Sequence, residues 1–104
     1  MRIHEFQKLI EDIYFQRDSS RGVERTFAWF VEEVGELSKA LMRRRDPSGR
    51  ELREELADVL AWLSTLASLE GISLEDAALE KYGKGCPRCG GTPCRCPMEP
   101  ARKS

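Results

Sequence analysis

The stretch "FVEEVGEL" (residues 30–37) and its partner "LREELADVL" (residues 52–60) decide how this chain is expected to fold. In both, acidic side chains stand inside an apolar run: Glu32, Glu33, Glu36, Glu54, Glu55 and Asp58. Apolar residues at helical spacing normally form the buried face of a helix. Carboxylates beside such a face repel one another and lose hydration, so their placement needs a physical reason.

The apolar residues around these acids recur at steps of four and three, which is typical of an amphipathic helix. Around the first stretch they are Val23, Phe27, Phe30, Val34, Leu37 and Leu41. Around the second they are Leu52, Leu56, Val59, Leu63 and Leu66. Between them, "RRRDPSGR" breaks the pattern, with Asp46 predicted as the N-cap and Pro47 as the first helical residue. Two long helices joined by a short loop predict an antiparallel hairpin.

Shorter helical segments are expected to flank this hairpin. Residues 2–16 carry apolar side chains at helical spacing, and "RDSSRG" (residues 17–22) is predicted to be a connector. Gly71 is predicted to end the second long helix, and Ser73 with Asp76 to start a short last helix. The sequence therefore predicts an all-α fold.

The length, the charge balance and the distribution of apolar residues limit which class of protein this can be. With 104 residues the chain is expected to be one domain with a small core, which oligomerisation, a metal or disulfides could reinforce. Its 17 basic and 18 acidic residues argue against a nucleic-acid binder. Neither a signal peptide nor an apolar run long enough to span a membrane is visible, so we expect a cytoplasmic protein.

The acids can be placed around each helix by allowing about 100° per residue. Glu33 and Glu36 then fall on one edge of the apolar seam of the first helix, which is the row of apolar residues from Val23 to Leu41. Glu55 and Asp58 fall on one edge of the corresponding seam of the second helix, from Leu52 to Leu66. In an antiparallel hairpin these edges can face each other, and four converging carboxylates suit one or two Mg²⁺ ions. The alternative is an ordinary solvated face paired with basic residues, for which Lys39, Arg25 and Arg53 are available.

"EEVGEL" followed after a turn by "EELADVL" resembles the E-E-x-x-E … E-x-x-D signature of the MazG-like, all-α nucleoside triphosphate pyrophosphohydrolases. The resemblance covers about residues 22–82. It implies a four-helix-bundle core completed by oligomerisation, as a homodimer or homotetramer. It also implies hydrolysis of NTPs or dNTPs to the monophosphate and pyrophosphate, in nucleotide-pool house-cleaning.

The resemblance also assigns roles to residues. The Mg²⁺ ligands would be Glu33, Glu36, Glu55 and Asp58. Glu32 and Glu33 would be catalytic, with Glu32 an accessory ligand or a base that orients water. Trp62 would contact the nucleobase, the alternative being packing in the core or at a dimer interface. Apart from the resemblance, Lys81 and Lys84 follow the short helix and could reach phosphates as point charges, and Trp29 is expected in the core. The segment "LEDAALEKYGKG" lacks the asparagine that many relatives carry there.

"CPRCGGTPCRC" forms a second motif after this helical body. It holds Cys86, Cys89, Cys94 and Cys96, spaced as C-x-x-C, four residues, then C-x-C. Four thiolates this close can surround one Zn²⁺, which would be structural because no coordination position stays open. A redox-active dithiol and a tail of free thiols are the alternatives. We therefore predict a helical domain over residues 1–84 and a zinc-binding tail over residues 85–104.

Two other functions stay open at this point. The hairpin could be a non-enzymatic dimerisation or adaptor module that recruits a partner through the zinc knuckle. The chain could also hydrolyse a nucleotide-like metabolite such as phosphoribosyl-ATP.

Overall fold

The computed structural model describes residues 1–43 and 47–98. These residues form four helices and no strand: α1 (Ile3–Arg21), α2 (Val23–Arg43), α3 (Arg50–Leu69) and α4 (Leu74–Tyr82). The all-α class is therefore confirmed for the described part of the chain. The chain divides into two compact units, Met1–Leu74 and Glu75–Ser104.

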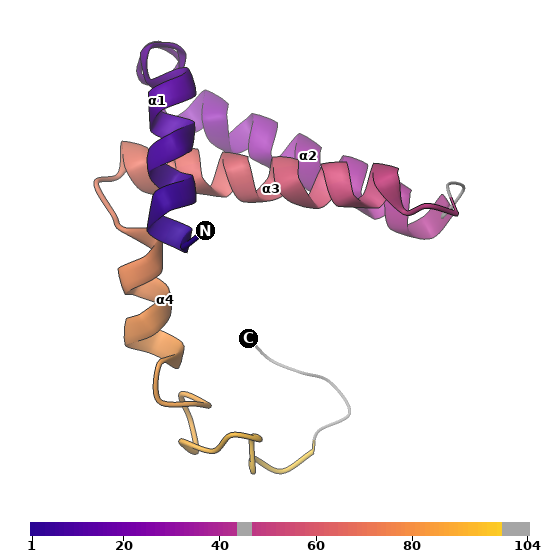
Figure 1. The fold of residues 1–104 in the computed structure, drawn as a ribbon, viewed down its shortest axis with the longest axis vertical. Coiled ribbons are helices and arrows are strands. Elements are labelled where there is room, and N and C mark those ends of the chain that lie inside the picture. The colour runs from indigo at the N-terminus through magenta and orange to yellow at the C-terminus, as the bar shows by residue number, and fades with distance from the viewer. Residues whose placement is uncertain (44–46, 99–104) are drawn as a thin grey trace. The chain divides into compact units, whose positions relative to one another are not determined.

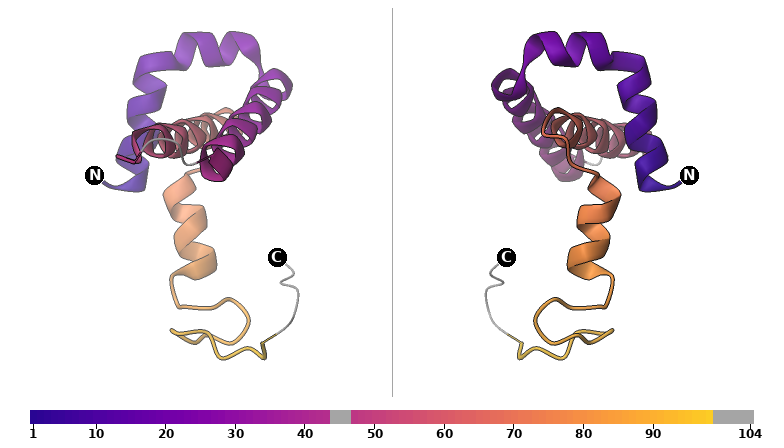
Figure 2. Two further views of the ribbon diagram at one scale, coloured as in Figure 1. Left: turned by 90° about the vertical axis from the view of Figure 1, so that its right-hand side faces the viewer. Right: turned by 90° about the vertical axis from the view of Figure 1, so that its left-hand side faces the viewer.

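Helices α2 and α3 pack side by side as the predicted antiparallel hairpin (Figures 1 and 2). The start of α3 differs from the prediction, because Pro47 lies in a turn and the helix begins only at Arg50. Gly49 precedes it at φ +73°, a backbone conformation that favours glycine, and Ser48 Oγ accepts the Arg50 N–H at 3.3 Å. Asp46, the predicted N-cap, lies outside the described residues.

Helix α1 is longer than predicted. The segment expected to be a connector continues the helix to Arg21, and Gly22 alone separates α1 from α2. Gly22 adopts φ +83°, and its N–H donates to the Asp18 carbonyl at 3.1 Å while its own carbonyl accepts from the Thr26 N–H at 3.1 Å. A single glycine thus ends one helix and begins the next.

The end of α3 follows the prediction. The helix ends at Leu69, and Gly71 follows at φ +69° with its N–H donating to the Ser68 carbonyl at 3.1 Å. Helix α4 begins directly after Ser73. No single helix among the described residues is long and apolar enough to cross a membrane; α3 and α4 pass such a test of length and composition only when taken together across their break.

The interior of the first unit is unusually polar. Its buried residues, among those described, are Gln7, Ile10, Asp18, Thr26, Ala40, Ser64 and Thr65. In the described part of the second unit only Gly91 is buried. The apolar seam of α2 stays largely exposed, with 56% exposure at Phe27 and 41% at Val34. The hairpin therefore leaves part of the apolar seam of α2 uncovered.

Candidate functional site

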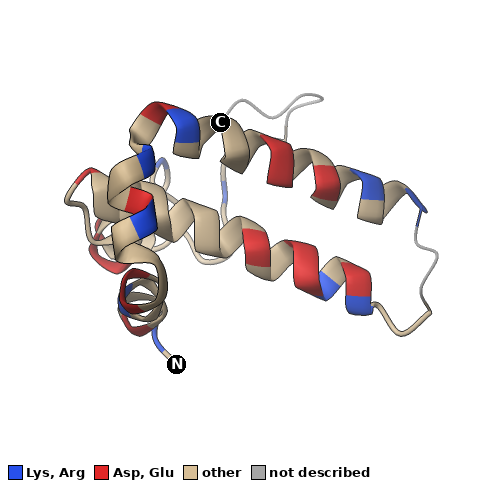
Figure 3. Cartoon of the chain, turned by 90° about the horizontal axis from the view of Figure 1, so that it is seen from above, with Lys and Arg blue, Asp and Glu red and all other residues tan. Residues whose placement is uncertain are grey.

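The acidic flanks of α2 and α3 face each other. Glu33 on α2 and Glu55 and Asp58 on α3 each offer a carboxylate oxygen, and these oxygens lie within 4.8 Å of one another. Figure 3 shows the acidic segments of the two helices at the same level along the hairpin. Three of the four predicted Mg²⁺ ligands are thus brought together from two helices.

In this acidic triad of Glu33, Glu55 and Asp58, the surroundings of the two glutamates disfavour their negative charges. Desolvation raises the pKa of Glu33 above its ordinary value of 4.5, and the nearby charge of Asp58 raises it further. Desolvation also raises the pKa of Glu55, followed by the charges of Glu33 and Asp58. The fold therefore holds the carboxylates close together against desolvation and mutual repulsion, and a bound cation would offset both.

One oxygen of the triad is available to such a cation. Glu55 Oε2 is buried and has no hydrogen-bond partner. A buried carboxylate oxygen without a donor is costly, and a divalent cation with hard oxygen ligands satisfies it. The residues present therefore fit Mg²⁺.

Glu36 and Glu32 lie beside the triad rather than in it. The Glu36 carboxylate is exposed and 3.5 Å from Lys39 Nζ. Its charge nonetheless raises the pKa of both Glu33 and Glu55, which places it on the same edge. Glu32 is exposed and also raises the pKa of Glu33. Ion pairs between exposed acids and basic residues of the same helix, the alternative role for these acids, occur at Glu36 and at Glu54. Glu54 Oε1 lies 3.5 Å from Arg50 Nε.

Two tryptophans lie one turn away from the acids. The rings of Trp29 and Trp62 meet edge to face with centroids 5.6 Å apart. Trp62 is half-buried, and its contact with a nucleobase stays a prediction. Trp29 was expected in the core but is 43% exposed, because it lies on a part of α2 that the other described helices leave uncovered.

Arg21 completes this region and was not predicted as a site residue. Its guanidinium carbon lies 4.9 Å from the centroids of both tryptophan rings. The same guanidinium pairs with Asp18 at 3.0 Å and donates to Thr26 Oγ1 at 3.2 Å, while Thr65 Oγ1 donates to the other Asp18 oxygen at 3.2 Å. Sequence reasoning had placed Arg21 in a connector. The i, i+3 spacing of Asp18 and Arg21, typical of one helix face, was the available signal.

The remaining predicted residues belong to the second unit. Lys81 and Lys84 are exposed, and Lys81 Nζ lies 5.5 Å from the Tyr82 ring centroid, so their phosphate contacts stay a prediction. The four cysteines form one cluster. Hydrogen bonds from the backbone N–H groups of Cys89 and Arg88 lower the pKa of the Cys86 thiol to about 6. Hydrogen bonds with Cys94 and Cys86 raise the pKa of Cys96 to about 12.

Comparison with known proteins adds an independent finding. Residues 21–90 match the profile of the family described as the MazG nucleotide pyrophosphohydrolase domain. This match covers α2, α3 and α4, and therefore the acidic triad and both tryptophans. A search of curated proteins found no match to the chain.

Proposed function

Because the chain belongs to the MazG nucleotide pyrophosphohydrolase domain family, we propose that it is a Mg²⁺-dependent enzyme that hydrolyses NTPs or dNTPs to the monophosphate and pyrophosphate. The observation that carries this proposal is the acidic triad, whose oxygens from two helices converge within 4.8 Å. The buried, unpartnered Glu55 Oε2 supports a cation there. House-cleaning of the nucleotide pool, in the cytoplasm, is the role that we assign to this activity.

The triad residues Glu33, Glu55 and Asp58 would hold the cation, with Glu36 as the fourth ligand once it leaves Lys39. Bound Mg²⁺ would supply a Lewis acid that offsets the charge developing on the phosphates and lowers the pKa of water. We propose one or two Mg²⁺ ions per site.

The chain's own residues then account for the reaction. The oxygen of a water molecule adds to the α-phosphorus, and the bond from that phosphorus to the bridging oxygen breaks, which releases pyrophosphate. Glu32, exposed beside Glu33, is the base that accepts the proton of this water. Trp62 offers a half-buried ring, one turn from Asp58, on which a base can stack. Lys81 and Lys84 would contact the phosphates as point charges.

A second copy of the chain would cover the exposed apolar side of the hairpin. Phe27, Val31 and Leu56 are each at least 51% exposed, and they belong to helices that already pack against each other. Exposed apolar residues on both helices of a hairpin are satisfied when a second hairpin completes a four-helix bundle. We therefore propose that the active form of the protein is a homodimer or homotetramer. Light scattering of the intact protein, compared with a Phe27→Asp variant that would dissociate, tests this assembly.

The activity is tested by turnover on a panel of NTPs, dNTPs and phosphoribosyl-ATP with Mg²⁺, in which pyrophosphate and orthophosphate are measured separately. A Glu55→Gln variant removes a charge from the triad, and Glu54→Gln, whose side chain is 66% exposed, is the matched control. Pyrophosphate release that needs Mg²⁺, survives in Glu54→Gln and disappears in Glu55→Gln supports the proposal. A folded protein that neither binds Mg²⁺ nor turns over any substrate would overturn it in favour of an adaptor.

A further inference from the structure

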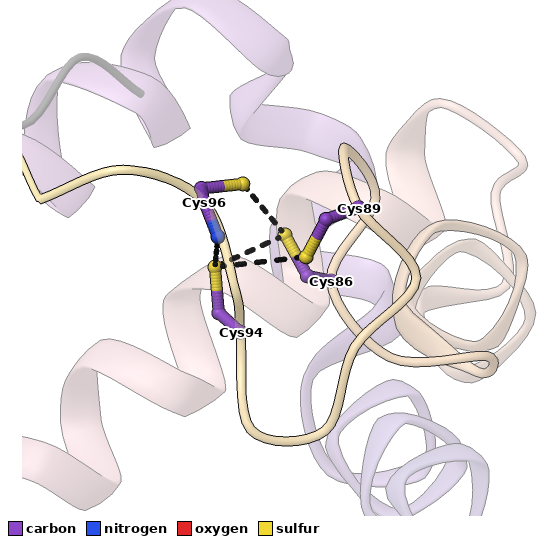
Figure 4. Close-up of side chains that lie close together, drawn as sticks. All are labelled: Cys86, Cys89, Cys94 and Cys96. Atoms are coloured by element: carbon purple, nitrogen blue, oxygen red, sulfur yellow. Dashed lines mark hydrogen bonds between the residues drawn. The ribbon is translucent and has the colours of Figure 1, made fainter.

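The four cysteines of the second unit form a cluster that the proposed hydrolysis does not use. Their thiols point toward one another (Figure 4). The sulfur atoms of Cys86 and Cys96 are 3.8 Å apart, those of Cys89 and Cys94 3.9 Å, and those of Cys94 and Cys86 3.6 Å. All four cysteines are free thiols, and all four sulfurs lie within 4.8 Å of one another.

These distances are those of a tetrahedral metal site. Four sulfurs at the usual Zn–S distance of about 2.3 Å occupy the corners of a tetrahedron whose edges are ~3.8 Å. The three sulfur–sulfur distances given above, 3.6–3.9 Å, bracket that value. Three of the six sulfur–sulfur distances therefore match a tetrahedral zinc site, and the other three are at most 4.8 Å.

The backbone around the cluster is folded to aim its N–H groups at sulfur. Cys89 Sγ accepts from the Gly91 N–H at 3.4 Å and from the Arg95 N–H at 3.2 Å. Cys94 Sγ accepts from the Cys96 N–H at 3.3 Å. Such donors stabilise thiolates and orient metal ligands, so they supply the outer shell of a thiolate site.

Glycines make this fold of the loop possible. Cys86 and the Gly90–Gly91 pair close a tight turn, in which the Gly90 N–H donates to the Cys86 carbonyl at 2.7 Å and the Cys86 N–H to the Gly91 carbonyl at 3.0 Å. Gly90 adopts φ +74°. At Gly85, with φ +101°, a Cβ atom would lie 2.7 Å from Thr92 Oγ1 and 2.9 Å from the Gly90 carbonyl oxygen. The loop is thus built around the cysteines at positions that a side chain would disturb.

The second unit has almost no hydrophobic core to hold this loop in place. No residue of α4 is buried, and of the described residues 75–98 only Gly91 is. Small units of this kind are usually held by a metal or by disulfides. Because the cysteines are free, a metal is the remaining cross-link.

We propose that Cys86, Cys89, Cys94 and Cys96 bind one Zn²⁺ as four thiolates, and that this ion holds residues 85–96 in their fold. Tetrahedral S₄ sites are typical of zinc or iron, and zinc adds no redox chemistry to a loop whose role is structural. The ion has no open coordination position, so it takes no part in hydrolysis. Binding is coupled to folding, because the ligand set is not preformed in the unfolded chain.

The test uses the full chain purified from zinc-supplemented cells, with metal content measured by mass spectrometry. A Cys89→Ser variant removes one ligand, and Met98→Ser, at a side chain 98% exposed in the same unit, is the control. We expect one zinc per chain in the parent and in Met98→Ser, and loss of most of it in Cys89→Ser. Chelator-treated protein refilled with Co²⁺ should give the visible absorption of a tetrahedral thiolate site in the same two proteins only.

Alkylation gives a second readout that does not depend on turnover. The four thiols should resist iodoacetamide when zinc is bound and react after chelation, while the helical circular dichroism of the first unit is retained. Zinc retained by Cys89→Ser, or iron in place of zinc, would overturn the assignment. So would thiols that alkylate freely in protein refilled with zinc. None of these outcomes depends on whether Mg²⁺ supports pyrophosphate release, so the two proposals stand or fall separately.

Discussion

The indole ring of Trp29 meets that of Trp62 edge to face, with centroids 5.6 Å apart and planes at 78°. This pair joins α2 to α3 one turn from the acidic triad, and Arg21 stands over both rings. The contact therefore links the C-terminal end of α1 to the side of the hairpin that carries the acids.

Trp62 is expected to bind the nucleobase. Stacking of a base on an aromatic ring is worth about 1–3 kcal/mol, so Trp62→Ala should raise KM roughly 5- to 150-fold with a smaller change in kcat. Trp62→Phe, which keeps an aromatic face, should retain most of the affinity. Steady-state kinetics on the best substrate of the panel measures both. An alanine variant that loses stability but keeps its KM would make Trp62 a packing residue only.

The ion pair of Arg21 and Asp18 should be essential as a pair. Their side chains are 12% and 10% exposed, so Arg21→Ala leaves a buried, unpaired carboxylate and should cost about 3–5 kcal/mol of unfolding free energy. Replacing both partners, as Arg21→Met with Asp18→Asn, should recover much of this loss. Urea unfolding of the single and double variants measures the coupling. Additive losses would show that Arg21 acts through the tryptophans instead.

Glu55 is expected to destabilise the metal-free protein at neutral pH. Its raised pKa means that, above the ordinary value of 4.5, the folded protein binds this proton more tightly than the unfolded chain does. The stability of the metal-free protein should therefore fall as pH rises from 4.5 through the raised pKa, and then level off. Glu55→Gln removes the part of this dependence that comes from Glu55, while the raised pKa of Glu33 keeps its own part, and the variant should melt higher than the parent in chelator at pH 7.5.

Thermal melts in chelator between pH 4.5 and 8 measure this difference, which should shrink toward pH 4.5. Since 1 kcal/mol corresponds to about 4–8 °C for a domain of this size, even a modest relief is detectable. Glu54→Gln, outside the triad, should follow the parent at every pH. A Glu55→Gln variant that melts lower than the parent at pH 7.5 would contradict the expectation.

Glu36 should contribute less to Mg²⁺ binding than Glu55. It already pairs with Lys39 at 3.5 Å and lies outside the triad, whereas Glu55 has a buried oxygen without a donor. Calorimetric titration with Mg²⁺ should show a weaker site in Glu36→Gln and none in Glu55→Gln. Equal losses in both variants would place Glu36 among the primary ligands.

Gln7 should hold the turn after α3. Its amide nitrogen donates to Ser68 Oγ at 3.0 Å and to the Ile72 carbonyl at 2.9 Å, and its oxygen accepts the Leu74 N–H at 2.9 Å. Gln7→Ala removes these three part-buried hydrogen bonds, although Ser68 Oγ still donates to Glu11 at 2.8 Å, and it should cost about 2 kcal/mol. Urea unfolding, with the exposed Gln16→Ala as control, measures this loss. Equal midpoints for the two variants would mean that water replaces the Gln7 amide.

Much of the architecture could be read from the spacing of residues. The steps of four and three predicted both long helices, and Gly71 marked the end of α3, because helix periodicity and glycine conformation are local properties. Two predicted boundaries were wrong: α1 ends at Arg21 rather than at residue 16, and α3 begins at Arg50 rather than at Pro47. A glycine with positive φ stands at each observed boundary and outweighs the local signals of "RDSSRG" and Pro47.

The sequence by itself determined the helices, the two acidic edges and the cysteine cluster, because each depends on residues a few positions apart. The tertiary structure alone decided which side of each helix faces the other. It turned the flanks of Glu33 and Glu55 inward and left Phe27 and Val34 exposed, since helix packing depends on the whole contact surface and not on apolar spacing. It also brought Arg21 to the tryptophans, a contact between α1 and the hairpin that no local pattern contains.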